Sequence, residues 1–410
     1  MSEKRYEANI IRATAVEPAN NLETTSAPGV WSIDEVLELQ KKNKWPTVGN
    51  VATDVDDVFS TFLWPGAGAS ATAVNNGIDL STEGGMVWIK SRTNPSSGHF
   101  HHLVDSARGQ SSGFYKALYS NGTEAENTYP SSTNGGVSSF NSNGFTISAG
   151  SNSNHFLNAS GYDYVGWTFR KAPKFFDVIQ FSGSTSADGG YNRIAHSLGT
   201  TVGLLLIKRT DSSGNWKAFA RNSSGTYISL ELNTTVAQQS TFSSGTYTIN
   251  DTDFSAWYLG MNVDGASYVA YAFAHNNNDG EFGPDSDQDV IKCGSYTGNG
   301  STTGTVVNLG FEPQWLMIKR TDTGGAGYNW FIFDAMRGMP VGGADQYLSA
   351  NLSDAEAGSS ERFKITPTGF QLASTSGSFN ASGGTYIYMA IRRGPLAAPT
   401  DATKVFAIDG

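Results

Sequence analysis

The sequence predicts an all-β protein: three tandem homologous β-sandwich domains, of jelly-roll or lectin-like type, behind an extended arm and one short helix. Glycine supplies 47 of the 410 residues and aromatic side chains 12% of them, a mixture that suits strands joined by many turns. Short apolar runs also recur along the chain, in the same order and with nearly constant spacing. Recurrence of this kind indicates an internal repeat.

The charge balance and the single cysteine exclude several classes of partner. The net charge is −10 and only 16% of residues are charged, so we expect no nucleic-acid partner, because phosphate binding needs clustered Lys and Arg. No run approaches the roughly 18 apolar residues of a membrane-spanning helix, and we expect no membrane insertion. Cys293 is the only cysteine, which excludes an intrachain disulfide and favours synthesis in a reducing cytoplasm.

The N-terminal part, residues 1–47, combines an aperiodic arm with one helix, expected over 32–43. Ser32 and Glu35 have the spacing of a capping box, and Pro46 ends the helical pattern. The helix either packs on the first domain or anchors the chain to a partner. We interpret the segment as a docking element whose contact residues are Trp31, Ile33, Leu37 and Trp45.

Two strands mark each unit of the repeat. An apolar strand ending in Ile-Lys occurs at residues 86–92, 204–209 and 315–320. An aromatic strand that follows an Asn-x-x-Gly turn occurs at residues 164–170, 268–274 and 386–392. We expect the apolar strands to be central and buried on both faces. The lysines at their ends, Lys90, Lys208 and Lys319, are expected to extend into solvent.

These landmarks divide the chain into domains. The units span 48–172, 173–283 and 284–396, and a tail covers 397–410. Each unit is about 110 residues long, the size of a two-sheet β-sandwich. We expect Cys293 to be a core residue on a strand of the third unit.

A charged turn recurs in two of the three units. Asp105 precedes Arg108 by three residues in the first unit, and Asp334 precedes Arg337 likewise in the third. A charge pair repeated at a fixed place typically holds a turn together. The second unit has only Ala220-Arg221 in this region, which argues against a functional role for the turn.

Histidine clusters only at residues 99–102. On a strand His99 and His101 point to the same face, and they are weak candidates for a metal site that three chains would complete. Alternatively His101 holds an ordinary strand position, because it aligns with Trp330 of the third unit. We favour the second interpretation and expect neither a metal nor a cofactor.

Catalytic signatures are few. No Gly-x-Ser-x-Gly, His-Glu-x-x-His or P-loop motif occurs, and we expect no enzymatic activity. The adjacent acids Asp56 and Asp57 are a weak candidate for cleaving glycans. Sugar binding by surface aromatic residues is a further alternative, with these candidates: Trp216, Trp257, Tyr258, Tyr328 and Trp330.

Several phrases in combination resemble a known group of proteins. They include the Asn-Gly-Ile-Asp-Leu of residues 76–80, the Ile-Lys-Cys-Gly-Ser-Tyr-Thr-Gly of 291–298 and the Glu-Pro-Gln-Trp of 312–315. Together they resemble virion structural proteins of marine tailed phages, of the kind labelled tail-fibre or tail proteins of cyanobacterial phages. The resemblance covers nearly the whole chain, and each phrase is a packing motif.

The resemblance implies a virion component that is assembled in the host cytoplasm. Such a protein docks on other virion proteins of the tail or capsid through its N-terminus and displays β domains for host attachment. By analogy with fibres it implies a homotrimer, and a host-surface glycan is a possible further partner. Two alternatives stay open from the residues alone: a carbohydrate-binding adhesin and a glycan depolymerase.

Overall fold

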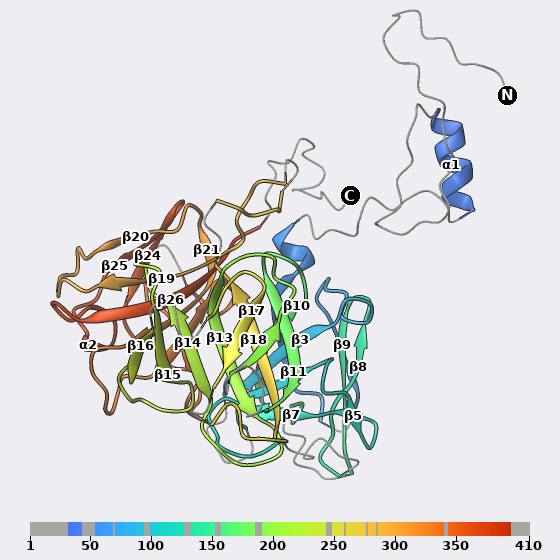
Figure 1. The fold of residues 1–410 in the computed structure, drawn as a ribbon, viewed down its shortest axis with the longest axis horizontal. Helices are drawn as coiled ribbons and strands as arrows, with labels where there is room; N and C mark the ends of the chain where they lie inside the picture. The colour runs from blue at the N-terminus through green and yellow to red at the C-terminus, as the bar shows by residue number, and fades with distance from the viewer. Residues whose placement is uncertain are drawn as a thin grey trace, which may run out of the picture. The chain divides into compact units, whose positions relative to one another are not determined.

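The computed structural model describes residues 32–42, 54–68, 70–93, 99–126, 133–151, 157–184, 191–242, 248–257, 260–275, 278–283, 286–339 and 343–394. The chain divides into two units, Met1–Thr53 and Asp54–Gly410. Within the described residues it is nearly all β, which confirms the predicted fold class (Figure 1).

The first unit holds the predicted helix, α1 (Ile33–Lys41). Its N-terminus forms the expected capping box: the Ser32 N–H donates to Glu35 Oε2 at 2.8 Å, and the Glu35 N–H donates to Ser32 Oγ at 3.4 Å. Acidic residues occupy the first turn and Lys41 the last, as the helix dipole favours.

The second unit contains three large antiparallel sheets in its described part, and each has a smaller sheet beside it. The first large sheet has the order β1 (Phe59–Pro65), β10 (Asp163–Arg170), β3 (Gly85–Ser91), β4 (His102–Asp105) and β7 (Ala117–Tyr119). Its companion has the order β2 (Thr72–Asn75), β9 (Gly144–Ser148) and β8 (Gly136–Asn141). A short hairpin, β5 (Gln110–Ser111) and β6 (Phe114–Tyr115), and the 3-10 turn η1 (Val55–Asp57) complete this part.

The other two large sheets repeat this strand order. The second has β11 (Phe176–Ser182), β18 (Ser267–Ala274), β13 (Val202–Arg209), β14 (Lys217–Arg221), β15 (Tyr227–Glu231) and β16 (Ser240–Phe242), with the pair β12 (Asn192–Ala195) and β17 (Asp253–Ala256) beside it. The third has β19 (Ile291–Thr297), β26 (Thr385–Arg392), β21 (Pro313–Arg320), β22 (Trp330–Asp334) and β23 (Leu348–Ser349), with β20 (Val306–Asn308), β25 (Gly369–Leu372) and β24 (Phe363–Thr366). The 3-10 turn η3 (Ala335–Arg337) and the short helix α2 (Gly377–Asn380) belong to it.

In each large sheet the first strand in sequence pairs with the last, and the last pairs with the central apolar strand. The strands of each sheet fall inside one of the ranges 48–172, 173–283 and 284–396. The division into three separate domains stays a prediction, because residues 54–410 form one compact unit.

The central strands of the large sheets are buried on both faces, which explains their continuous apolar sequences. One face packs on the companion sheet, for example around Phe145 and Phe370. The opposite faces meet one another: the Phe169 ring lies 5.4 Å from the Phe273 ring and 6.0 Å from the Trp315 ring, centroid to centroid. All three large sheets therefore share a central aromatic core.

Backbone hydrogen bonds close the three sheets into a ring. Each bond joins a connection between strands of one repeat to the residue just after the apolar strand of the next. The bonds are Glu126 N to Thr210 O (2.7 Å), Gln238 N to Thr321 O (2.8 Å) and Glu356 N to Arg92 O (2.7 Å). The last one joins the third sheet back to the first.

The three repeated lysines do not extend into solvent, so that expectation is wrong. Lys90, Lys208 and Lys319 are each at most 1% exposed. Each ammonium group donates to the carbonyl of the next residue, at 2.7 to 2.8 Å. A long apolar stem reaches solvent only where a strand end lies at the surface, and here the neighbouring sheet covers that end.

Candidate functional site at the seams between the sheets

The charged pair in the turn of the third sheet is buried and structural. Asp334 Oδ1 accepts from the Arg337 N–H at 2.9 Å, and Oδ2 accepts from Arg337 Nε at 2.6 Å. The same Oδ2 accepts a hydrogen bond from the indole of Trp167, in the first sheet, at 2.9 Å. The Arg337 guanidinium also lies over the Trp167 ring. The pair holds its turn, as the sequence predicts, and joins two sheets.

The equivalent turn of the first sheet makes the same connection to the second sheet. Asp105 Oδ2 accepts from Arg108 Nε at 2.5 Å and from the Tyr271 hydroxyl at 2.7 Å. Burial raises the pKa of Tyr271 well above its usual range, so the hydroxyl keeps its proton and donates. Burial disfavours the Arg108 cation, but Asp105, together with Tyr271 and Glu126, outweighs this and raises the Arg108 pKa.

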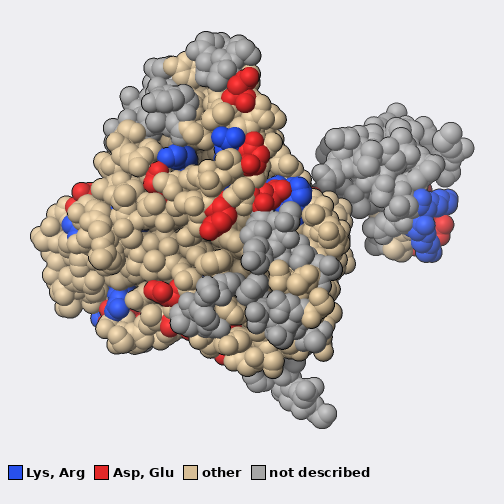
Figure 2. Space-filling model, turned by 90° about the horizontal axis from the view of Figure 1, so that it is seen from below, with Lys and Arg blue, Asp and Glu red and all other residues tan. Residues whose placement is uncertain are grey.

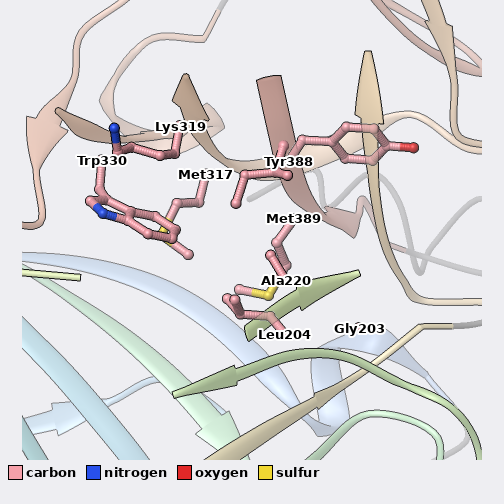
Figure 3. Close-up of a pocket in the computed structure, with 9 residues that line it drawn as sticks. Gly203, Leu204, Ala220, Met317, Lys319, Trp330, Tyr388 and Met389 are labelled. Atoms are coloured by element: carbon pink, nitrogen blue, oxygen red, sulfur yellow. The ribbon is translucent and has the colours of Figure 1, made fainter. Parts of the chain in front are cut away.

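The seam between the second and third sheets replaces this polar contact with an apolar one. In the strand pairings Ala220 lies opposite Leu204, just as Asp334 lies opposite Trp315. Trp167 and Tyr271 each donate to a carboxylate of the neighbouring sheet. At the corresponding position the third sheet has Met389, which cannot donate. Met389 and Ala220 line a cavity of about 10 Å³, near the lower limit for one water molecule (Figure 3). Ala220 therefore replaces the acid and Met389 replaces the donor, so neither sheet buries a polar group without a partner at this position.

His101 holds a structural position. Its backbone N–H donates to Asn121 Oδ1 at 3.0 Å, and the backbone N–H of Trp330 donates to Asn351 Oδ1 at 2.8 Å. The predicted alignment of His101 with Trp330 is therefore confirmed. His101 Nδ1 accepts from the Trp88 indole at 2.9 Å. Burial, with cations nearby, holds the His101 pKa well below its usual range and keeps the ring neutral.

The geometry assumed for a histidine metal site is wrong. Residues 99–101 precede β4, so His99 and His101 do not share a strand face. The His99 ring packs on Tyr162, with centroids 5.2 Å apart. His101 is fully buried and cannot reach another chain. No group of three His, Cys, Asp or Glu side chains that suits a metal occurs in the described part of the chain.

The predicted docking residues are described in part. Leu37 lies on α1 with 46% of its surface exposed. Ile33 is the first residue of that helix. Trp31 and Trp45 lie outside the described residues. None of the described helices is long and apolar enough to cross a membrane.

The carboxylates proposed for glycan cleavage share one turn. Asp56 and Asp57 both lie in η1, where Asp57 Oδ2 accepts from the Asp54 N–H at 2.9 Å. Burial, then the neighbouring acids, raises the Asp56 pKa. A glycosidase instead sets its two carboxyl groups on either side of the scissile bond.

The aromatic candidates for sugar binding are mostly core residues. Trp216 and Trp330 are fully buried, and Trp257 is 4% exposed, so none offers a ring face to a ligand. Tyr328 is half-buried beneath the Arg320 guanidinium, 4.9 Å from the ring centroid. Tyr258 lies outside the described residues. Cys293, expected in the core, is 2% exposed on β19.

One face of the molecule shows charged side chains scattered among uncharged ones (Figure 2). The two buried charged pairs connect one sheet to the next through Trp167 and Tyr271. Residues 54–395 match a family model described as a domain of unknown function (DUF7483). No curated protein matches the chain.

Proposed function

We propose that this chain, which belongs to the DUF7483 family because the family model covers residues 54–395, is a structural protein of a tailed-phage particle. In this proposal the N-terminal segment docks on another virion protein of the tail or capsid, and the β unit is displayed outward for host contact. The phrases that resemble marine phage virion proteins support it, as does the use of buried polar groups for packing.

The observation that carries the proposal is the division of the chain into an N-terminal unit and a β unit. Residues 1–53 form their own unit and lie outside the family match. Their helix is capped, and it presents Leu37 to solvent. An exposed leucine on a short amphipathic helix is typical of a contact that a partner groove completes.

The test is incorporation into particles. We expect deletion of residues 1–46, and Leu37→Glu in the full chain, to abolish incorporation, because the charge cannot enter an apolar groove. Val306→Glu is the matched control: Val306 is 58% exposed on β20, in the β unit, and this variant should be incorporated normally. Normal incorporation of the deletion and of Leu37→Glu would contradict the docking role.

The homotrimer belongs to the same proposal. Light scattering on the purified full chain should give three times the chain mass of 43.7 kDa. A monomer at micromolar concentration would overturn the trimer and leave the docking role standing, because one chain already presents its sheets as a closed ring.

A further inference from the structure

A second, larger cavity lies at the seam between the second and third sheets. Its volume is about 300 Å³. The second sheet contributes Arg221 at the end of β14, Ser223 from the connection to β15, and His275, which follows β18. The third sheet contributes Lys292, Cys293 and Tyr388 from β19 and β26.

The cavity lies where the second sheet departs from the others. In the third sheet η3 follows β22 and contacts β1, the first strand of the next sheet. In the first sheet Ala107, in the charged turn, accepts from Gln180 on β11. The second sheet has no such turn. Instead, the tip of its β14–β15 hairpin contacts the β19 strand of the third sheet, where Ser223 Oγ donates to Ser295 O at 2.8 Å. Space therefore remains beside the hairpin.

The cavity carries positive charge that no described acidic side chain neutralises. Arg221 and Lys292 are half-buried, and neither makes an ion pair with any described residue. Among the described residues, no Asp or Glu lines the cavity. Burial raises the pKa of the Cys293 thiol, so it stays neutral and adds no negative charge. Two neighbouring cations with no described acidic partner are unusual in a chain of net charge −10.

The wall also holds a buried donor. Tyr388 is 6% exposed, and its hydroxyl hydrogen-bonds to no described residue. The ring crosses β19 over Gly294, where a Cβ would lie 2.7 Å from the hydroxyl. Figure 3 shows the ring turned away from Trp330 and Met317. Burial raises the Tyr388 pKa, so the hydroxyl stays protonated and donates.

We propose that this cavity binds an oxyanion: a phosphate, sulfate or carboxylate group, free or carried on a larger molecule. Arg221 offers a planar pair of N–H donors that matches two oxygens of such a group, and Lys292 adds a second charge. The Tyr388 hydroxyl supplies a third donor. The site is independent of the docking role of the N-terminal segment.

Calorimetric titration of the full chain tests the site, with inorganic phosphate, sulfate and acetate as separate probes at equal ionic strength. We expect saturable binding of at least one probe at one site per chain, and the preferred probe identifies the chemical source. Arg221→Gln and Lys292→Gln should each weaken binding about tenfold or more, while Arg221→Lys retains part of it. Tyr388→Phe should weaken it less.

Lys364→Gln is the matched control, because it removes one positive charge from an exposed position on β24. Its affinity should equal that of the unmodified chain. Far-UV circular dichroism checks that each variant is folded. The proposal is overturned by the absence of saturable binding for all three probes. It is equally overturned if Arg221→Gln and Lys292→Gln bind unchanged, or if Lys364→Gln loses as much affinity as they do.

Discussion

Asp334 accepts hydrogen bonds from both the backbone and the side chain of Arg337 and from Trp167, while its side chain is fully buried. Removing one partner of a buried ion pair leaves an uncompensated charge and costs about 3 to 5 kcal/mol. We expect Asp334→Ala to lower the free energy of unfolding by that amount, measured in urea. Asp211→Ala, which breaks the exposed pair with Arg209, should cost at most about 1 kcal/mol. Equal losses would contradict a structural role for the buried pair.

The buried lysines predict how stability depends on pH. Burial lowers the pKa of Lys208 from 10.5 to about 8. Between these values the unfolded chain binds more protons than the folded one, so stability rises with pH, and the cost of the buried charge is complete below pH 8. From pH 8 to 9.5 we expect the free energy of unfolding of the natural chain to rise by about 1 to 2 kcal/mol relative to that of Lys208→Met.

The control for this lysine is Lys364→Met, at an exposed position on β24. Its free energy of unfolding should run parallel to that of the natural chain over the same pH range. A parallel curve for Lys208→Met as well would show that Lys208 titrates normally in the folded protein.

At the scale of elements, a glycine allows β9 to begin against β2. Gly144 has φ +124°, and a Cβ there would lie 2.0 Å from the Val74 carbonyl oxygen. Gly113, in the turn between β5 and β6, has φ +83° and nothing within 4 Å of its Cβ position. Gly113→Ala should therefore cost only the backbone strain, about 1 to 2 kcal/mol. Gly144→Ala must also displace β2, and we expect a larger loss in urea unfolding, with faster amide exchange along β2.

The sequence predicted some elements well and others poorly, for local reasons. The start of α1 followed from Ser32 and Glu35, because capping is decided within four residues. The burial of Lys90 could not be predicted, because an apolar strand that ends in lysine has the same sequence pattern whether that end lies in solvent or is covered. His101 was recognised as an ordinary repeat position only because Trp330 aligned with it, and its bond to Trp88 had no signal of its own.

At the scale of the whole molecule, the shared core and the closed ring predict one cooperative unit. Phe169, Phe273 and Trp315 belong to different sheets and pack together, and Glu356 joins the third sheet back to the first. Calorimetry of residues 54–395 should show one heat-absorption peak. Residues 54–283 alone should melt at a much lower temperature, because they expose the central core. Three separable peaks would instead show that the predicted domains fold on their own.

The sequence by itself determined the all-β class, the repeat, the capped helix and the charged turns, because these depend on patterns within one strand or turn. The tertiary structure decided what the repeated residues do. Asp334 and Trp167 lie far apart in the chain and meet only when the sheets close into a ring. The oxyanion cavity arises in the same way, because Arg221 and Lys292 come together only where one sheet lacks the turn that occupies the corresponding place in the other two.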